Sequence, residues 1–291
     1  MSAPVCHRSR SAARTPSPQV HPSRSVSTRR LPEGDYTLII GGTSGLGREI
    51  ALQCLERNVT PIVLGRSAQR AVADQDLKKA VPFTLDLFDL GRLASSIHRL
   101  LRFIDQANIT HLFWVAGIAQ SRPFLDLTRI EIAHLLGVHL EGSLLLLHSL
   151  LNQRKERGQP VHLVVVSSTS VYGDCNGNEL LNAVQAAKAS VARGLASSLL
   201  RDVPGSLVSL FMLAAMDTAF HTDRSVDSTS LLQPEQVATI MAVQTGVGHG
   251  PTHRPSQMST VTTPFARFLV ERELDGSPRV NLYTAFPDQP F

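Results

Sequence analysis

Cysteine is scarce in this chain of 291 residues: there are three, Cys6, Cys54 and Cys175, and no two of them form a CxxC pair. This scarcity excludes a disulfide framework and a zinc site of paired cysteines, and it is typical of a reducing compartment. We therefore expect no bound metal. The apolar fraction of 43% is enough for a large buried core in one or two domains.

Acidic residues are missing from the first thirty positions, and the first to appear is Glu33. The same stretch holds six arginines among many Ser and Pro residues, so we expect residues 1–33 to form a disordered N-terminal extension. Without those six arginines the chain has 22 Lys and Arg against 24 Asp and Glu, and its formal net charge falls from +4 to −2. The excess of basic over acidic residues thus comes from the extension, so nucleic acid is not an expected partner.

Targeting by this extension is an alternative, because an Arg- and Ser-rich start without acids also fits an organelle transit peptide. Pro16, Pro18 and Pro22 would interrupt an amphipathic helix there. We therefore expect a plain extension on a cytoplasmic protein.

Long apolar runs are also missing. The longest, residues 144–147 with their flanks, is broken by His139, Glu141 and His148 and is too short to cross a bilayer. The sequence therefore predicts no membrane span.

What the chain does have is a glycine-rich turn after an apolar strand. Residues 36–47 read Tyr-Thr-Leu-Ile-Ile-Gly-Gly-Thr-Ser-Gly-Leu-Gly, and the amphipathic segment 48–57 follows as a helix. Glycine allows a tight turn and close approach of a pyrophosphate, while the helix start offers free N–H groups and a positive dipole end. The pattern predicts dinucleotide binding by Gly41, Thr43, Ser44, Gly45, Leu46 and Gly47.

The rest of the chain alternates short β-rich runs with helical periodicity. Near-continuous apolar strands such as Val161–Val166 are expected where helices cover both faces of a parallel sheet. The predicted fold is a single α/β domain over 34–291, a doubly wound Rossmann-type parallel sheet with helices on both faces. Further strands are predicted at 61–64, 81–85, 111–115, 207–213 and 279–284, helices at 90–104, 130–157, 180–200 and 234–243, and polar substrate loops near 170–178 and 219–232, with another loop at 245–263.

With this order of elements, the chain resembles the short-chain dehydrogenase/reductase family, in its single-domain branch, over roughly residues 35–286. Gly41, Gly45 and Gly47 match the family's TGxxxGxG turn, with Ile40 in place of the leading Thr. In the family a basic residue after the second strand contacts the 2′-phosphate of NADP, so Arg66 implies NADP as the cofactor. A solvated surface arginine is the alternative.

The resemblance implies two more cofactor contacts along the chain. Asp86 and Leu87 match the family's adenine-contacting pair, although Asp86 or Asp89 could instead cap the next helix. Thr218 matches the family's threonine beside the nicotinamide.

Of the family's Asn-Asn-Ala-Gly segment, this chain has only the Ala and the Gly. Ala116 and Gly117 would allow close approach of the cofactor, whereas Trp114 and Val115 replace the asparagines and are expected in the core of the sheet.

The family's catalytic pattern is degenerate here. A Ser after the fifth strand and a Tyr-x-x-x-Lys pair on the next helix carry the chemistry in the family. Lys188 stands at the lysine position, but Val184 occupies that of the tyrosine, and valine has no proton to give. Ser168 matches the serine because it ends the fifth strand, and Ser170 is a weaker contender.

Two other side chains could compensate for the missing phenol. Tyr172 follows Ser168 in a run similar to the Ser-Ser-x-x-Val-Tyr-Gly turn of the family's epimerase and dehydratase branch, a comparison that also selects Ser168. His139 aligns with the family's helix asparagine. It could relay protons near neutral pH or be a hydrogen-bonded core histidine.

The resemblance thus implies an NADP-dependent oxidoreductase acting on a carbonyl or secondary alcohol of a small molecule that the sequence does not identify. A catalytically silent NADP-binding regulator or partner subunit is the alternative, and redox-neutral lyase or isomerase chemistry is a third. Family members often associate through the helix that carries the lysine, so a homodimer or homotetramer is a further expectation.

Overall fold

The structure, a computed structural model, describes residues 30–120, 122–172, 177–214, 216, 218 and 231–249, apart from the side chain of Tyr172. Beyond these it gives the backbone of three strands, β7 (Val261–Thr263), β8 (Ala266–Glu271) and β9 (Asn281–Phe286). Residues 1–29 and most of the predicted loop at 219–232 lie outside the described residues.

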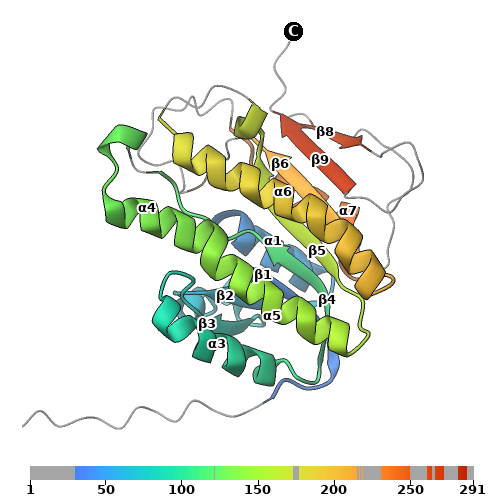
Figure 1. Ribbon diagram of the computed structural model, residues 1–291. Coiled ribbons are helices and arrows are strands. Elements are labelled where there is room, and N and C mark those ends of the chain that lie inside the picture. The colour runs from blue at the N-terminus through green and yellow to red at the C-terminus, as the bar shows by residue number, and fades with distance from the viewer. Residues whose placement is uncertain are drawn as a thin grey trace, which may run out of the picture.

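A twisted sheet runs through the molecule in the strand order β3-β2-β1-β4-β5-β6-β9-β8-β7. The strands from β3 to β9 in this order are parallel, whereas β8 and β7 are antiparallel additions at one edge (Figure 1). The first six strands are β1 (Gly34–Ile40), β2 (Thr60–Gly65), β3 (Val81–Thr84), β4 (Ala107–Trp114), β5 (His162–Ser168) and β6 (Leu207–Leu213).

Helices cover both faces of this sheet. Figure 1 shows α3, α5 and α6 on the near face, with α1 and α7 on the far one. The helices are α1 (Gly45–Glu56), α2 (Ala68–Ala71), α3 (Leu90–Phe103), α4 (Arg129–Leu136), α5 (Gly142–Glu156), α6 (Glu179–Asp202) and α7 (Pro234–Thr245). The doubly wound Rossmann-type fold is confirmed.

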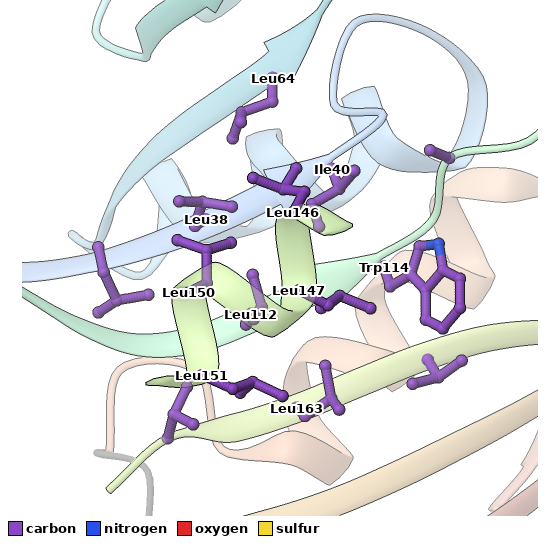
Figure 2. Close-up of a cluster of buried hydrophobic side chains, with 14 of the residues drawn as sticks. Leu38, Ile40, Leu64, Leu112, Trp114, Leu146, Leu147, Leu150, Leu151 and Leu163 are labelled. Atoms are coloured by element: carbon purple, nitrogen blue, oxygen red, sulfur yellow. The ribbon is translucent and has the colours of Figure 1, made fainter. Parts of the chain in front are cut away.

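Apolar side chains on both faces of the strands hold these layers together. Along β4, Leu112 and Trp114 belong to the cluster under α3, α5 and α6, while Phe113 between them belongs to the cluster under α1 and α7. Figure 2 shows Leu146 and Leu150 of α5 lying over the strands. A strand buried on both sides cannot alternate with polar residues, which explains the continuous apolar runs in the sequence.

Three details differ from the sequence-based expectation. The predicted helix 130–157 is divided by a π-helical turn, Gly137–Glu141, between α4 and α5. The predicted loop at 245–263 ends in a strand, β7. Leu31, assigned to the extension by composition, is only 8% exposed, and its N–H donates to the Phe103 carbonyl oxygen, so the folded part begins earlier than residue 34.

The continuous helical stretch Arg129–Glu156 is long and apolar enough to cross a membrane by length and composition alone. In the fold it is a core helix, because Leu146, Leu147 and Leu150 are at most 2% exposed and pack on the sheet.

The π-helical turn lies against the loop after β3, and two glycines permit this contact. A Cβ on Gly142 would lie 1.9 Å from the carbonyl oxygen of Leu87, and one on Gly137 would lie 2.9 Å from the Phe88 ring. Any larger residue at position 142 would push α5 away from the backbone of that loop.

We expect Gly142→Ala to lower the free energy of unfolding by about 1–3 kcal/mol, as overpacking does, seen as a lower urea midpoint. The matched control is Gly194→Ala on α6, where a Cβ meets nothing within 4 Å. In an exposed helix interior that change should stabilise by about 0.5–1 kcal/mol. Equal effects of the two substitutions would contradict the close contact.

Candidate cofactor and active site

A cleft of about 940 Å³ opens at the carboxyl ends of β1, β4 and β5, where ligands bind in doubly wound sheets. It brings together every predicted site residue whose side chain is described. These are Gly41, Thr43, Ser44, Gly45, Leu46, Gly47, Arg66, Asp86, Leu87, Ala116, Gly117, His139, Ser168, Lys188 and Thr218.

The glycine turn between β1 and α1 is a backbone cradle. Gly41 has φ +93°, and a Cβ there would lie 2.7 Å from the backbone N of Ala116. A Cβ on Gly47 would fall 2.1 Å from the Gly41 carbonyl oxygen. Side chains at these positions would collide with the backbone, so only glycine allows the tight turn that leads into the N-terminus of α1, a geometry that suits the pyrophosphate of a dinucleotide.

The adenosine end of the cleft contains the groups that the sequence left ambiguous. Arg66 is exposed at the end of β2 and lines the cleft. Asp89 is the helix cap, accepting from the Arg92 N–H at 3.2 Å, whereas Asp86 lines the cleft and accepts from the Phe88 N–H at 3.0 Å.

Thr218 lies beside the glycine turn. A Cβ on Gly45 would meet its Cγ2 at 3.4 Å, so the threonine is in contact with the start of α1 and lines the cleft there.

Lys188 on α6 is buried deep in the cleft, with 1% of its surface exposed. Its Nζ donates to the Ala116 carbonyl oxygen at 3.3 Å and lies 4.9 Å from the centre of the Trp114 ring. Among the residues that the structure describes, no carboxylate forms an ion pair with it. Burial therefore lowers the pKa of Lys188 to about 7.

His139 lies in the π-helical turn and is fully buried. Its Nε2 is 2.9 Å from the Ile118 backbone N and 2.8 Å from the Ile118 carbonyl oxygen, so the tautomer decides which of them it bonds. Burial, aided by the charge of Lys188, lowers the pKa of His139 to about 3. The imidazole is thus neutral at physiological pH, and the predicted proton relay through it stays a prediction.

Ser168 is joined to α6 through a chain of hydrogen bonds. Its Oγ accepts from the Ser170 N–H at 3.2 Å and lies 2.8 Å from the Ser170 hydroxyl, which in turn donates to Asn182 Oδ1 at 2.6 Å. Both serines line the cleft. The predicted catalytic serine and its weaker contender are therefore hydrogen-bonded to each other, and the catalytic role of either stays a prediction.

Val184 is fully buried in an apolar cluster with Leu135 and Leu181, and Ile118 packs against this cluster. It does not line the described cleft. A Val184→Tyr change would overpack this cluster unless the ring turned out of it, because the added volume has no empty space to enter.

Asn178 ends the predicted substrate loop 170–178, whereas Asn182 and Gln185 were not predicted as site residues; all three line the cleft. They precede Lys188 at intervals of three or four residues, at the N-cap and along α6, which places them on one helix face. This spacing was the available signal. Tyr172, a predicted substitute for the missing phenol, has its backbone in the turn Thr169–Tyr172, but its side chain lies outside the described residues.

A family model of the short-chain dehydrogenases matches residues 35–228. The chain belongs to this family. Among curated proteins, the 3-oxoacyl-(acyl-carrier-protein) reductase FabG of Aquifex aeolicus is 28% identical over 153 residues, which are 50% of this short-chain dehydrogenase and 61% of that reductase. The match therefore spans less than two thirds of the relative's own length.

Solved structures agree with the fold. A short-chain dehydrogenase from Streptomyces avermitilis superposes with TM-score 0.62 at 22% identity, covering 76% of this chain and 87% of that one. A 3-ketoacyl-(acyl-carrier-protein) reductase from Brucella melitensis, complexed with NADH, superposes with TM-score 0.63 at 21% identity. The match covers 73% of this chain and 91% of that one.

The buried Lys188 should be visible in the pH dependence of stability. Its folded pKa of about 7 lies below the ordinary lysine pKa of 10.5, so between these values the unfolded chain binds more protons and stability rises with pH. Below about pH 7 the cost of burying the charge is present in full. We expect Lys188→Met to remove this rise. In urea unfolding, the stability of the variant relative to the wild type should therefore be higher at pH 6.5 than at pH 10. If the difference in unfolding free energy between the wild type and the variant stays constant across this range, the amine is not buried as described.

Proposed function

We propose that this chain is an NADP-dependent oxidoreductase that interconverts a small-molecule carbonyl and the corresponding secondary alcohol. The observation that carries the proposal is the position of Lys188, buried without a carboxylate partner in the same cleft as the glycine cradle and Ser168. Burying an unpaired amine is unfavourable, so its retention favours a function over a structural role.

The preference for NADP rests on Arg66. Among the described residues it forms no ion pair, and no acidic residue follows β2 in the run Gly65-Arg66-Ser67. A second hollow shares Thr43 with the cleft and is also lined by Ser67 and Arg70, and by Arg48 and Asp74, which form an ion pair with each other at 2.9 Å. The guanidinium groups of Arg66 and Arg70 and the hydroxyls of Thr43 and Ser67 suit a phosphate on the ribose.

When bound, the cofactor would supply or accept a hydride, and the chain's own residues would handle the proton and the substrate oxygen. Val184 has no proton, and His139 is neutral with a pKa of about 3. Among the described cleft residues, Lys188 holds a proton that can be given up near neutral pH, since its pKa is about 7. Ser168 would orient the oxygen that receives it.

The second candidate is a catalytically silent NADP-binding protein. The observation that favours it is the apolar packing of Val184, which fills the tyrosine position without leaving a polar group there. Both candidates require the cofactor, and turnover separates them.

Cofactor preference is tested by titrating the full chain with NADPH and NADH and following nicotinamide fluorescence. We expect Arg66→Ala to raise the Kd for NADPH by about 10–100-fold, the worth of a charged hydrogen bond to the phosphate, and to leave NADH binding nearly unchanged. Arg193→Ala removes the same charge from the exposed surface of α6 and should change neither affinity. An equal loss for both cofactors would count against the phosphate contact.

Catalysis is tested by NADPH consumption with a panel of ketones and aldehydes. We expect turnover, and we expect Ser168→Ala to lower kcat by about 10²–10³-fold at unchanged NADPH affinity, because a donor to the reacting oxygen is lost. NADPH binding without turnover of any compound would favour the silent candidate.

A further inference from the structure

Polar atoms without partners gather at one part of the cleft. Asn178 Oδ1, Asn182 Nδ2 and Gln185 Oε1 are buried and have no hydrogen-bond partner among the described residues, and all three side chains line the cleft. An unsatisfied buried polar group costs about 1–3 kcal/mol, and most buried groups are therefore paired. Three such atoms in one place indicate that a ligand completes them.

The three amides form a continuous surface along α6. Residues 178, 182, 185 and 188 recur at intervals of three or four, and Lys188 marks the end nearest the nicotinamide position that the family fold implies. At 1.5 Å per residue, the surface extends about 15 Å from Lys188 toward the N-terminus of the helix. That length leaves room for substrate groups beyond the reacting carbon.

Asn182 is the best-fixed member of this surface. It is 6% exposed, and its Oδ1 is occupied by the Ser170 hydroxyl, which also lies 2.8 Å from Ser168 Oγ. The free half of the amide is therefore the Nδ2 donor. Ser168 and Asn182 thus belong to one hydrogen-bonded unit, which places a neutral donor near the oxygen that Ser168 would orient.

Charge is lacking where these amides lie. Among the described residues that line the cleft, Arg66 and Asp86 lie at the adenosine end, and Lys188 is buried against Trp114 and Ala116. A substrate carboxylate would find no guanidinium beside the amides. Two acceptors and one donor instead match a substrate that has hydroxyl or amide groups and no charge.

We propose that Asn178, Asn182 and Gln185 form the substrate-recognition surface, and that it binds an uncharged carbonyl compound with a hydroxyl or amide group beside the reacting carbon. This proposal rests on the proposed reductase function of the cleft. Asn182 is its positioning residue, and it holds the polar neighbour of the carbonyl rather than transferring a proton.

The test compares three probes with one carbon skeleton: 1-hydroxybutan-2-one, 2-oxobutanoate and butan-2-one. The full chain is assayed with NADPH, and binding of each probe to the protein with and without cofactor is followed by saturation-transfer NMR. We expect kcat/KM for the hydroxyketone to exceed the values for the other two by at least about tenfold, the worth of one hydrogen bond.

Asn182→Leu should abolish this preference. Asn182→Asp keeps the size of the side chain but removes the donor, so it should also lower the preference for the hydroxyketone. NADPH affinity should stay unchanged in both, which shows that the fold is intact. Asn152→Leu makes the same change on the exposed surface of α5 and should keep the preference.

Equal kcat/KM for the three probes, a preference for 2-oxobutanoate, or a preference that survives in Asn182→Leu and Asn182→Asp would overturn the amide surface while leaving the reductase function standing. If no probe is turned over, NMR decides. Hydroxyketone binding that is lost in Asn182→Leu would support the amide surface and count against the reductase, and equal or absent binding of all probes would overturn the surface itself.

Discussion

Lys188 is an amine with 1% exposure, held by one carbonyl oxygen and one aromatic face, and the arrangement of the cleft follows from keeping it there. To reach Ala116 and Trp114, Lys188 extends from α6, which packs along β5 and β6. The preceding polar positions of the helix then line the same cleft. The glycine turn and Thr218 line the cleft as well.

Apolar and polar positions alternate closely on α6 around the position of the family's tyrosine. Val184, at that position, lies in an apolar cluster with Leu135 and Leu181. Asn182 and Gln185, close to it in the sequence, carry unpaired amide atoms. Under the function that we propose, the site would use neutral hydrogen bonds for orientation and the amine for the proton.

Sequence reasoning reached the fold and brought the predicted cofactor residues into one cleft because both depend on local chemistry. Gly41 and Gly47 are required by backbone contacts that no other residue permits, and an apolar run such as Val161–Val166 has few places outside a covered sheet. The N-terminal extension, the oligomeric state and the cytoplasmic location stay predictions.

The substrate end was less predictable because it depends on which side chains meet in space. Nothing near Asn182 in the sequence shows that Ser170 occupies its oxygen, and nothing near His139 shows that burial holds its pKa at about 3. The π-helical turn was equally hidden, since its residues share the apolar periodicity of the helix on either side.

That turn links the two ends of the cleft mechanically. Gly142 rests on the backbone of Leu87 at the adenosine end, and His139, three residues earlier, holds Ile118 near the substrate end. The single helical segment from α4 to α5 therefore contacts the cleft wall that contains Leu87 and also the wall that contains Ile118, so one element sets the positions of both.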